Sequence, residues 1–310
     1  MRAQFSEFTF GFSLVSELAN TLECRAAPIF PSLIEEGQPG GGYDVVMDLA
    51  AVPFFLQFKL SEHLKTNAAK EAKHPSGLIS APYRRFHITS PMKSNQHASL
   101  LGLASTAEHV YYCAPDFYRT DDLNYLWGSG GVAHGSVFVR PEDIGPILDD
   151  ERHAVCFNGT TLSNGECILF SKPKALTPSS IPKVSDSVHA SLAETKLPLR
   201  TLIGRWEEDF EEARQVARSV QDEQETTIQQ LLEERRRGAL EDQAIDQADR
   251  QLTVRVQTFY EDPEPMALRT RVPVPSEVEA DPMTRRLHEL SRRAATEFGS
   301  QMFVLQPQSS

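Results

Sequence analysis

Three polar residues stand where two short apolar runs would be expected to form buried strands. Asp44 lies in the run "YDVVMDL", and Gln57 and Lys59 lie in "PFFLQFKL". Burying such groups without partners is costly, so each of them needs a binding partner. A divalent cation would provide one, because the Asp44 carboxylate, the Gln57 amide oxygen and the backbone carbonyl of Phe58 are the hard oxygen ligands that Mg²⁺ accepts. Side chains alternate along a strand, so Gln57 and Lys59 are expected on one face, with Lys59 beside the metal.

This set of groups predicts phosphodiester hydrolysis with Mg²⁺ or Mn²⁺ as cofactor. The metal would polarise a phosphoryl oxygen and generate hydroxide, and the lysine would orient the attacking water and stabilise negative charge. Structural alternatives remain open for two of the residues. Asp44 could cap the preceding glycine turn, and Lys59 could pack its stem on apolar neighbours with its ammonium in water. Gln57 is the hardest to explain structurally, because an amide within an apolar run must be hydrogen-bonded.

The segments "GGYD" at 41–44 and "QFK" at 57–59 resemble the motifs of the PD-(D/E)XK nuclease superfamily, and most of all its Mrr-type restriction endonucleases. The resemblance implies an α/β fold with a mixed sheet flanked by helices, and a DNA endonuclease with a role in bacterial defence. It also implies a glutamate from the first helix at the metal site, for which Glu17 is the candidate and Glu36 the alternative. The chain departs from the pattern in having Gln57 where an acid is usual, which predicts weaker metal binding or an inactive site.

A local excess of positive charge predicts a nucleic-acid contact in a chain whose net charge is -12. Seven Lys and Arg residues and two acidic residues lie between 57 and 97. Arg84 and Arg85 could bind phosphates through their guanidinium groups, and His97 is a further candidate phosphate contact. The resemblance implies a helix whose polar residues reach the substrate, for which Gln96 is the candidate. A solvated lysine-rich loop and ordinary salt bridges are the alternatives.

The order of elements indicates an α/β or α+β domain over residues 1–175, followed by a mainly helical region over 176–310. The resemblance implies that the first domain is nuclease-like. Helical spacing occurs at 10–23 and at 95–105, and the runs 43–49 and 53–60 are close enough to form an antiparallel hairpin. Amphipathic stretches over 200–258 are expected to mediate oligomerisation, partner binding or substrate choice. Two other functions are therefore possible: a catalytically inactive nuclease fold that serves as an interaction module, and a helical assembly protein.

Composition places the chain among ordinary globular proteins, with 40% hydrophobic and 24% charged residues. It contains no apolar run long enough for a membrane span and no signal-peptide pattern at its start, so a cytoplasmic protein without membrane contact is expected. Its four cysteines form no C-x-x-C pair, which favours buried free thiols.

Overall fold

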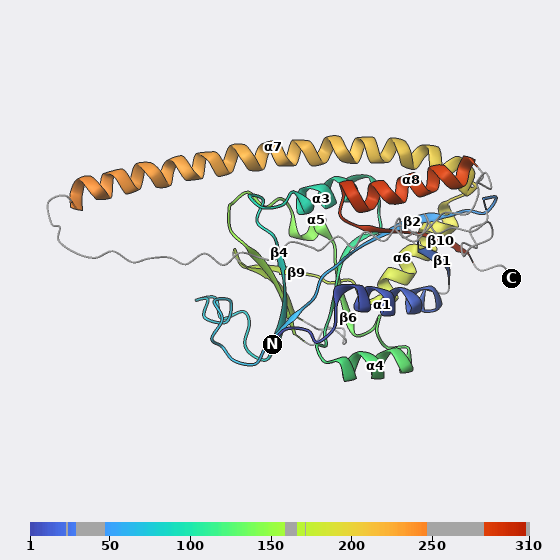
Figure 1. The fold of residues 1–310 in the computed structure, drawn as a ribbon, viewed down its shortest axis with the longest axis horizontal. Coiled ribbons are helices and arrows are strands. Elements are labelled where there is room, and N and C mark those ends of the chain that lie inside the picture. The colour runs from blue at the N-terminus through green and yellow to red at the C-terminus, as the bar shows by residue number, and fades with distance from the viewer. Residues whose placement is uncertain (23, 29–46, 159–165, 171, 247–281, 308–310) are drawn as a thin grey trace, which may run out of the picture.

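The computed structural model describes residues 1–22, 24–28, 47–158, 166–170, 172–246 and 282–307 (Figure 1). Asp44 and Glu36 lie outside these residues, as do the glycines of the "GGYD" motif.

The first sheet carries the candidate site and has five strands in the order β1-β10-β2-β5-β6. Strand β2 runs parallel to β5, and the other neighbours are antiparallel. The connection from β2 to β5 includes helix α3. The bounds are β1 Cys24–Pro28, β2 Val52–Phe58, β5 Val110–Pro115, β6 Ser136–Val139, β10 Gln301–Pro307 and α3 Gln96–Thr106.

The two neighbours of β2 show that the predicted hairpin between 43–49 and 53–60 is wrong. On one edge Phe54 pairs with Phe303 of β10, and on the other Phe55 pairs with Val110 of β5. Both edges of β2 are therefore taken by strands distant in the sequence. Residues 47–49 instead meet the start of helix α7 (Leu199–Asp246), where the backbone carbonyl of Leu49 accepts a hydrogen bond from the backbone nitrogen of Leu199.

The second sheet is antiparallel throughout, with the order β3-β4-β7-β8-β9. Its strands are β3 Glu62–Leu64, β4 Tyr83–Ile88, β7 His153–Asn158, β8 Glu166–Phe170 and β9 Lys174–Leu176. Strands β3 and β4 lie in sequence between β2 and α3, so Arg84 and Arg85 of the basic stretch lie on this second sheet, and its lysines lie outside the strands.

Helices cover both faces of the first sheet and make a three-layer α/β architecture. Helices α3, α7 and α8 lie on one side, and α1 and α4 lie on the other (Figure 1). Alternation along β2 explains the layers, because Phe54 belongs to the buried cluster that contains Phe10 of α1, whereas Phe55 belongs to the cluster on the α3 and α7 side. The helices are α1 Glu7–Thr21, α4 Thr120–Ser129, α5 Pro141–Ile144, α6 Ile181–Glu194, α7 Leu199–Asp246 and α8 Pro282–Glu297.

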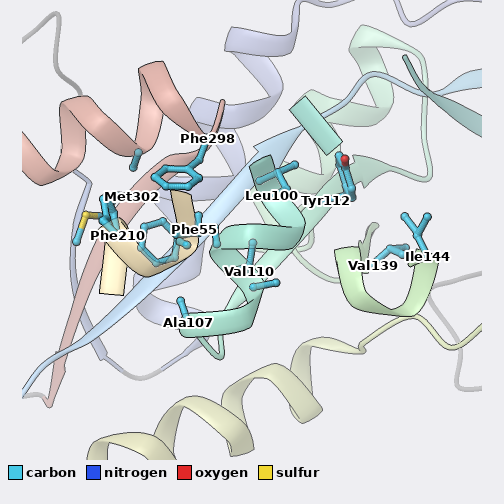
Figure 2. Close-up of a cluster of buried hydrophobic side chains, with 14 of the residues drawn as sticks. Phe55, Leu100, Ala107, Val110, Tyr112, Val139, Ile144, Phe210, Phe298 and Met302 are labelled. Carbon is cyan, nitrogen blue, oxygen red and sulfur yellow. The ribbon is translucent and has the colours of Figure 1, made fainter. Parts of the chain in front are cut away.

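Aromatic side chains join the amino-terminal and carboxy-terminal regions in one core. Phe210 of α7 lies 5.9 Å from Phe55 and 5.2 Å from Phe298, measured between ring centroids, and Met302 of β10 packs beside them (Figure 2). Such aromatic pairs contribute about 0.5–1.5 kcal/mol each beyond the area they bury. The division expected at residue 175 thus does not separate two cores, since β10 returns to the interior of the first sheet.

The mixed α/β content and the long helical segment of the carboxy-terminal region agree with the sequence-based expectation. All four cysteines are free and buried, as predicted. Among the helices in the described part of the chain, none combines the length and the apolar character needed to cross a membrane.

Candidate functional site

Four of the predicted site residues meet through one chain of hydrogen bonds at the carboxyl end of β2. The Lys59 ammonium donates to the Gln96 amide oxygen at 2.7 Å, and the Gln96 amide nitrogen donates to the Gln57 amide oxygen at 3.0 Å. The Gln57 nitrogen in turn donates to the backbone carbonyl of Phe58 at 3.0 Å. We call this chain, from Lys59 through Gln96 and Gln57 to Phe58, the amide relay. Gln57 and Lys59 are thus linked through the same Gln96 side chain, as expected for residues on one face of the strand.

Lys59 determines the direction of the amide relay. An ammonium group only donates hydrogen bonds, so Gln96 must present its oxygen to Lys59 and its nitrogen to Gln57. Gln57 must then accept through its oxygen, which turns its own nitrogen toward the Phe58 carbonyl. The predicted requirement that the Gln57 amide be hydrogen-bonded is met on both of its polar atoms.

The Lys59 ammonium is a partly desolvated cation with an acidic neighbour. Burial lowers the pKa of Lys59, and the negative charge of Glu7 raises it in part. Burial likewise raises the pKa of Glu7, and Lys59 opposes that shift. The ammonium also lies 5.8 Å from the ring centroid of Tyr112. Desolvated lysines of this kind are typical of sites where an amine contacts a substrate or takes part in chemistry.

Glu7 was not predicted as a site residue, because Glu17 of the same helix was chosen instead. Glu17 is 8% exposed, and its carboxylate accepts hydrogen bonds from the backbone nitrogens of Val132 at 2.7 Å and Ala133 at 3.1 Å. Its assignment to the metal site is therefore corrected: Glu17 fixes the loop before β6 to α1. Glu7 lies in the first turn of α1, whereas Glu17 lies nearer the other end of the helix. Helical spacing places both acids on one helix, but it does not show which end of that helix approaches β2.

The predicted metal ligands Gln57 and Phe58 do not fit a shared cation in this arrangement. The Gln57 nitrogen, rather than its oxygen, faces the Phe58 carbonyl. Turning that amide would require Gln96 to turn as well, which would place the Gln96 nitrogen against the Lys59 ammonium, and both groups are donors. Within the described residues, no group of three or more His, Cys, Asp and Glu side chains could hold a metal ion. The main predicted ligand, Asp44, lies outside the described residues.

His97 is a buried structural residue, which corrects its assignment as a phosphate contact. It is 4% exposed, and its ring nitrogens lie 2.9 Å from the Tyr112 hydroxyl and 2.8 Å from the Gly145 carbonyl. Because the carbonyl can only accept, the nitrogen facing Gly145 carries the proton and the other accepts from Tyr112. Burial lowers the pKa of His97 to about 4. His97 therefore supports the Tyr112 ring beside Lys59 and does not itself face a substrate.

The two predicted phosphate-binding arginines have different surroundings. The Arg85 guanidinium binds Glu62 at 2.8 Å and Glu71 at 2.7 Å, so its donors are already engaged by carboxylates. This corrects its assignment as a phosphate contact. Arg84 contacts the His63 ring, and its Nε lies 3.7 Å from the Asp116 carboxylate. This Nε is buried and makes no hydrogen bond within the described residues.

A recess of 560 Å³ at the opposite end of β2 contains serine, histidine and glutamate side chains. Ser191 donates to Glu108 at 2.7 Å, and the His109 Nε2 lies 3.1 Å from the Ser191 hydroxyl oxygen. In a nucleophilic triad, the acid holds the second nitrogen of the histidine. Here the acid binds the serine hydroxyl itself and the other His109 nitrogen is buried without a partner, so Ser191 is not activated as a nucleophile.

The position of the amide relay in the fold favours an anionic ligand. Strands β2 and β5 are parallel, and ligands of open α/β sheets bind at the carboxyl ends of such strands. Gln96 is the first residue of α3, so the amino end of that helix, which carries partial positive charge, also lies at the relay. The desolvated Lys59 ammonium and this helix end together would suit a phosphoryl group.

Comparison with known proteins found no match for this chain among family models, curated proteins or solved structures.

Proposed function

We propose that this protein is a metal-dependent nuclease that hydrolyses the phosphodiester bonds of DNA. The observation that carries the proposal is the desolvated Lys59 ammonium, which the amide relay holds at the carboxyl ends of two parallel strands. The proposal also draws on the resemblance of "GGYD" and "QFK" to the motifs of the PD-(D/E)XK nucleases and on the mixed α/β content of the fold. A role in defence against foreign DNA follows from that resemblance.

Lys59 would act directly on the reacting phosphodiester. Phosphoryl transfer develops negative charge on oxygens, and a preoriented cation in a poorly solvated site stabilises that charge more effectively than one in water. Gln96 and Gln57 would position the ammonium, and the first turn of α3 would bind a second phosphoryl oxygen. Asp44 is the proposed ligand of Mg²⁺ or Mn²⁺, which would supply Lewis-acid activation when bound, and Glu7 replaces Glu17 as the proposed acidic neighbour.

The test is DNA cleavage by wild-type protein and a matched pair of lysine variants. Supercoiled plasmid and linear DNA are incubated with Mg²⁺ or Mn²⁺, and cleavage is followed on gels. We expect Lys59→Met to reduce the rate at least about 100-fold, the loss typical of removing a transition-state contact. Lys183→Met, at an exposed position on α6, should cut at the wild-type rate. Equal cleavage by both variants would contradict the proposal.

An inactive interaction module is the second candidate, and one observation favours it. The Gln57 and Phe58 oxygens that were predicted to bind metal already accept hydrogen bonds within the amide relay. Under this alternative, the exposed part of α7, within the 200–258 stretch, would bind a protein partner or a second copy of the chain.

Thermal unfolding with Mn²⁺ distinguishes the two candidates. A bound cation raises Tm by mass action on the folded state, whereas a protein that binds none shows no shift. The nuclease proposal predicts a shift for wild type that is absent from Asp44→Ala. The interaction module predicts no shift for either protein.

A further inference from the structure

A second group of cationic and aromatic side chains lies beside the candidate site, centred on Tyr118. The rings of His63 and Tyr118 are stacked with centroids 4.7 Å apart and an interplanar angle of 10°. The Lys65 ammonium lies 6.0 Å from the centroid of the Tyr118 ring, and the guanidinium carbon of Arg84 lies 5.7 Å from it. We call these four residues the Tyr118 cluster.

Positive charge is concentrated in the Tyr118 cluster. The pKa of His63 is lowered, first by burial and then by the charges of Arg84 and Lys65, which shows that both cations act on one ring. Asp116, 3.7 Å from the Arg84 Nε, offsets one of these two charges. The adjacent Arg85 differs, because its single positive charge lies between the carboxylates of Glu62 and Glu71.

The Tyr118 cluster is connected to Lys59 by a short segment along the end of β5. The backbone nitrogen of Lys59 donates to the Cys113 carbonyl at 2.8 Å, and the Ser61 hydroxyl donates to the Pro115 carbonyl. An extended chain advances about 3.3 Å per residue, so His63 lies at most about 13 Å from Lys59. Successive phosphates of a B-form strand are at least the axial rise of about 3.4 Å apart, so that reach covers at most about four nucleotide steps.

We propose that the Tyr118 cluster is a phosphate-binding subsite for the nucleic-acid strand whose scissile bond reaches Lys59. The Arg84 guanidinium offers a planar set of donors that matches phosphate oxygens, and the exposed Lys65 ammonium adds a second cation. Both cations lie within about 6 Å of the Tyr118 ring, at 6.0 Å for Lys65 and 5.7 Å for Arg84. The two proposed phosphate contacts are therefore Arg84 and Lys65, and Lys65 replaces Arg85, which was predicted from the sequence. The inference depends on the proposed function for its substrate.

The test measures binding without cleavage. Fluorescence anisotropy of a fluorescein-labelled DNA duplex is recorded in EDTA over a range of salt concentrations. Each lost phosphate contact reduces the slope of log K against log salt by about 0.9, equivalent to about eightfold weaker binding near 0.1 M salt. We expect this change for Lys65→Gln. Lys183→Gln, at an exposed lysine of α6 outside the basic stretch, is the control and should retain the wild-type slope.

The outcomes separate this inference from the proposed function. If Lys65→Gln binds with wild-type affinity and slope, or if wild-type protein does not bind the duplex, the subsite is refuted. If Lys65→Gln loses one contact while Lys59→Met still cuts DNA, the subsite is supported and the catalytic role of Lys59 is refuted. Circular dichroism of Lys65→Gln should match wild type, because the side chain is exposed.

Discussion

Gly299→Ala should disturb the amide relay, although Gly299 is not part of the relay. Gly299 has a φ of +62°, and a Cβ atom there would lie 2.8 Å from the Gln96 amide nitrogen and 3.5 Å from the Gln57 amide oxygen. The first contact is too short, so the Gln96 amide must move. Movement of Gln96 weakens its hydrogen bonds to Gln57 and Lys59.

The expected loss of stability has a backbone part and a contact part. A side chain in the left-handed region costs about 1–2 kcal/mol, and about 0.4–1 kcal/mol is regained from the reduced entropy of the unfolded chain. Weakening the hydrogen bonds of Gln96 adds about 1 kcal/mol. We therefore expect Gly299→Ala to lower the free energy of unfolding by about 2 kcal/mol in total.

Gly130→Ala is the matched control. Gly130 has a φ of +67°, but nothing lies within 4 Å of the Cβ position, so only the backbone part applies. Urea unfolding at pH 7, compared at equal m-values, should give a loss for Gly130→Ala about 1 kcal/mol smaller than for Gly299→Ala. Equal losses for the two variants would refute the packing of Gly299 against Gln96, and with it this part of the relay geometry.

Three further predictions concern the helix contact, the buried histidine and the desolvated lysine. Gly102→Ala should lose about 3 kcal/mol or more, because its Cβ would lie 2.2 Å from the Ala213 carbonyl oxygen. Gly204→Ala in α7 has only an ordinary 3.5 Å contact and should gain about 0.5–1 kcal/mol in urea unfolding; similar results for the two variants would contradict the close approach of α3 and α7. Between pH 6.5 and 4 the unfolded chain binds a proton at His97 that the folded protein does not, so wild type should lose up to about 3 kcal/mol as the pH falls. His97→Gln should show a shallower decline in urea midpoint over that range, and parallel profiles would argue against a neutral buried His97. Because the pKa of Lys59 is lowered on folding, the stability of wild type relative to Lys59→Met should rise as the pH increases toward 10.5, whereas a constant difference would mean that Lys59 is not desolvated.

Local patterns in the sequence predict much of the site's scaffold. Helical spacing at 10–23 and 95–105 corresponds to α1 and α3. The unusual amide of Gln57 correctly indicates that a polar partner lies close by. These features depend on periodicity and on the cost of burying polar groups, both of which act over a few residues.

Long-range contacts account for the expectations that proved wrong. The partner of β2 is β10, about 250 residues later in the chain, and no local pattern specifies that pairing. Arg85 is neutralised by Glu62 and Glu71. These acids come beside it only when β3 pairs with β4 and the loop between these two strands folds back. Glu7 rather than Glu17 approaches Lys59 for the same reason, since the docking of α1 on the sheet determines which of its acids faces β2.

The pKa of the Lys59 ammonium, measured with and without bound DNA, tests the central claim most directly. Lysine side-chain NMR, with the Lys59 signal assigned by its absence from Lys59→Arg, gives the pKa by titration. We expect a value below the ordinary lysine range in the free protein, because burial lowers it, and a rise when a non-hydrolysable phosphorothioate duplex places an anion beside the amine. An ordinary pKa that does not respond to the duplex would contradict the assignment of Lys59 to the reacting phosphodiester.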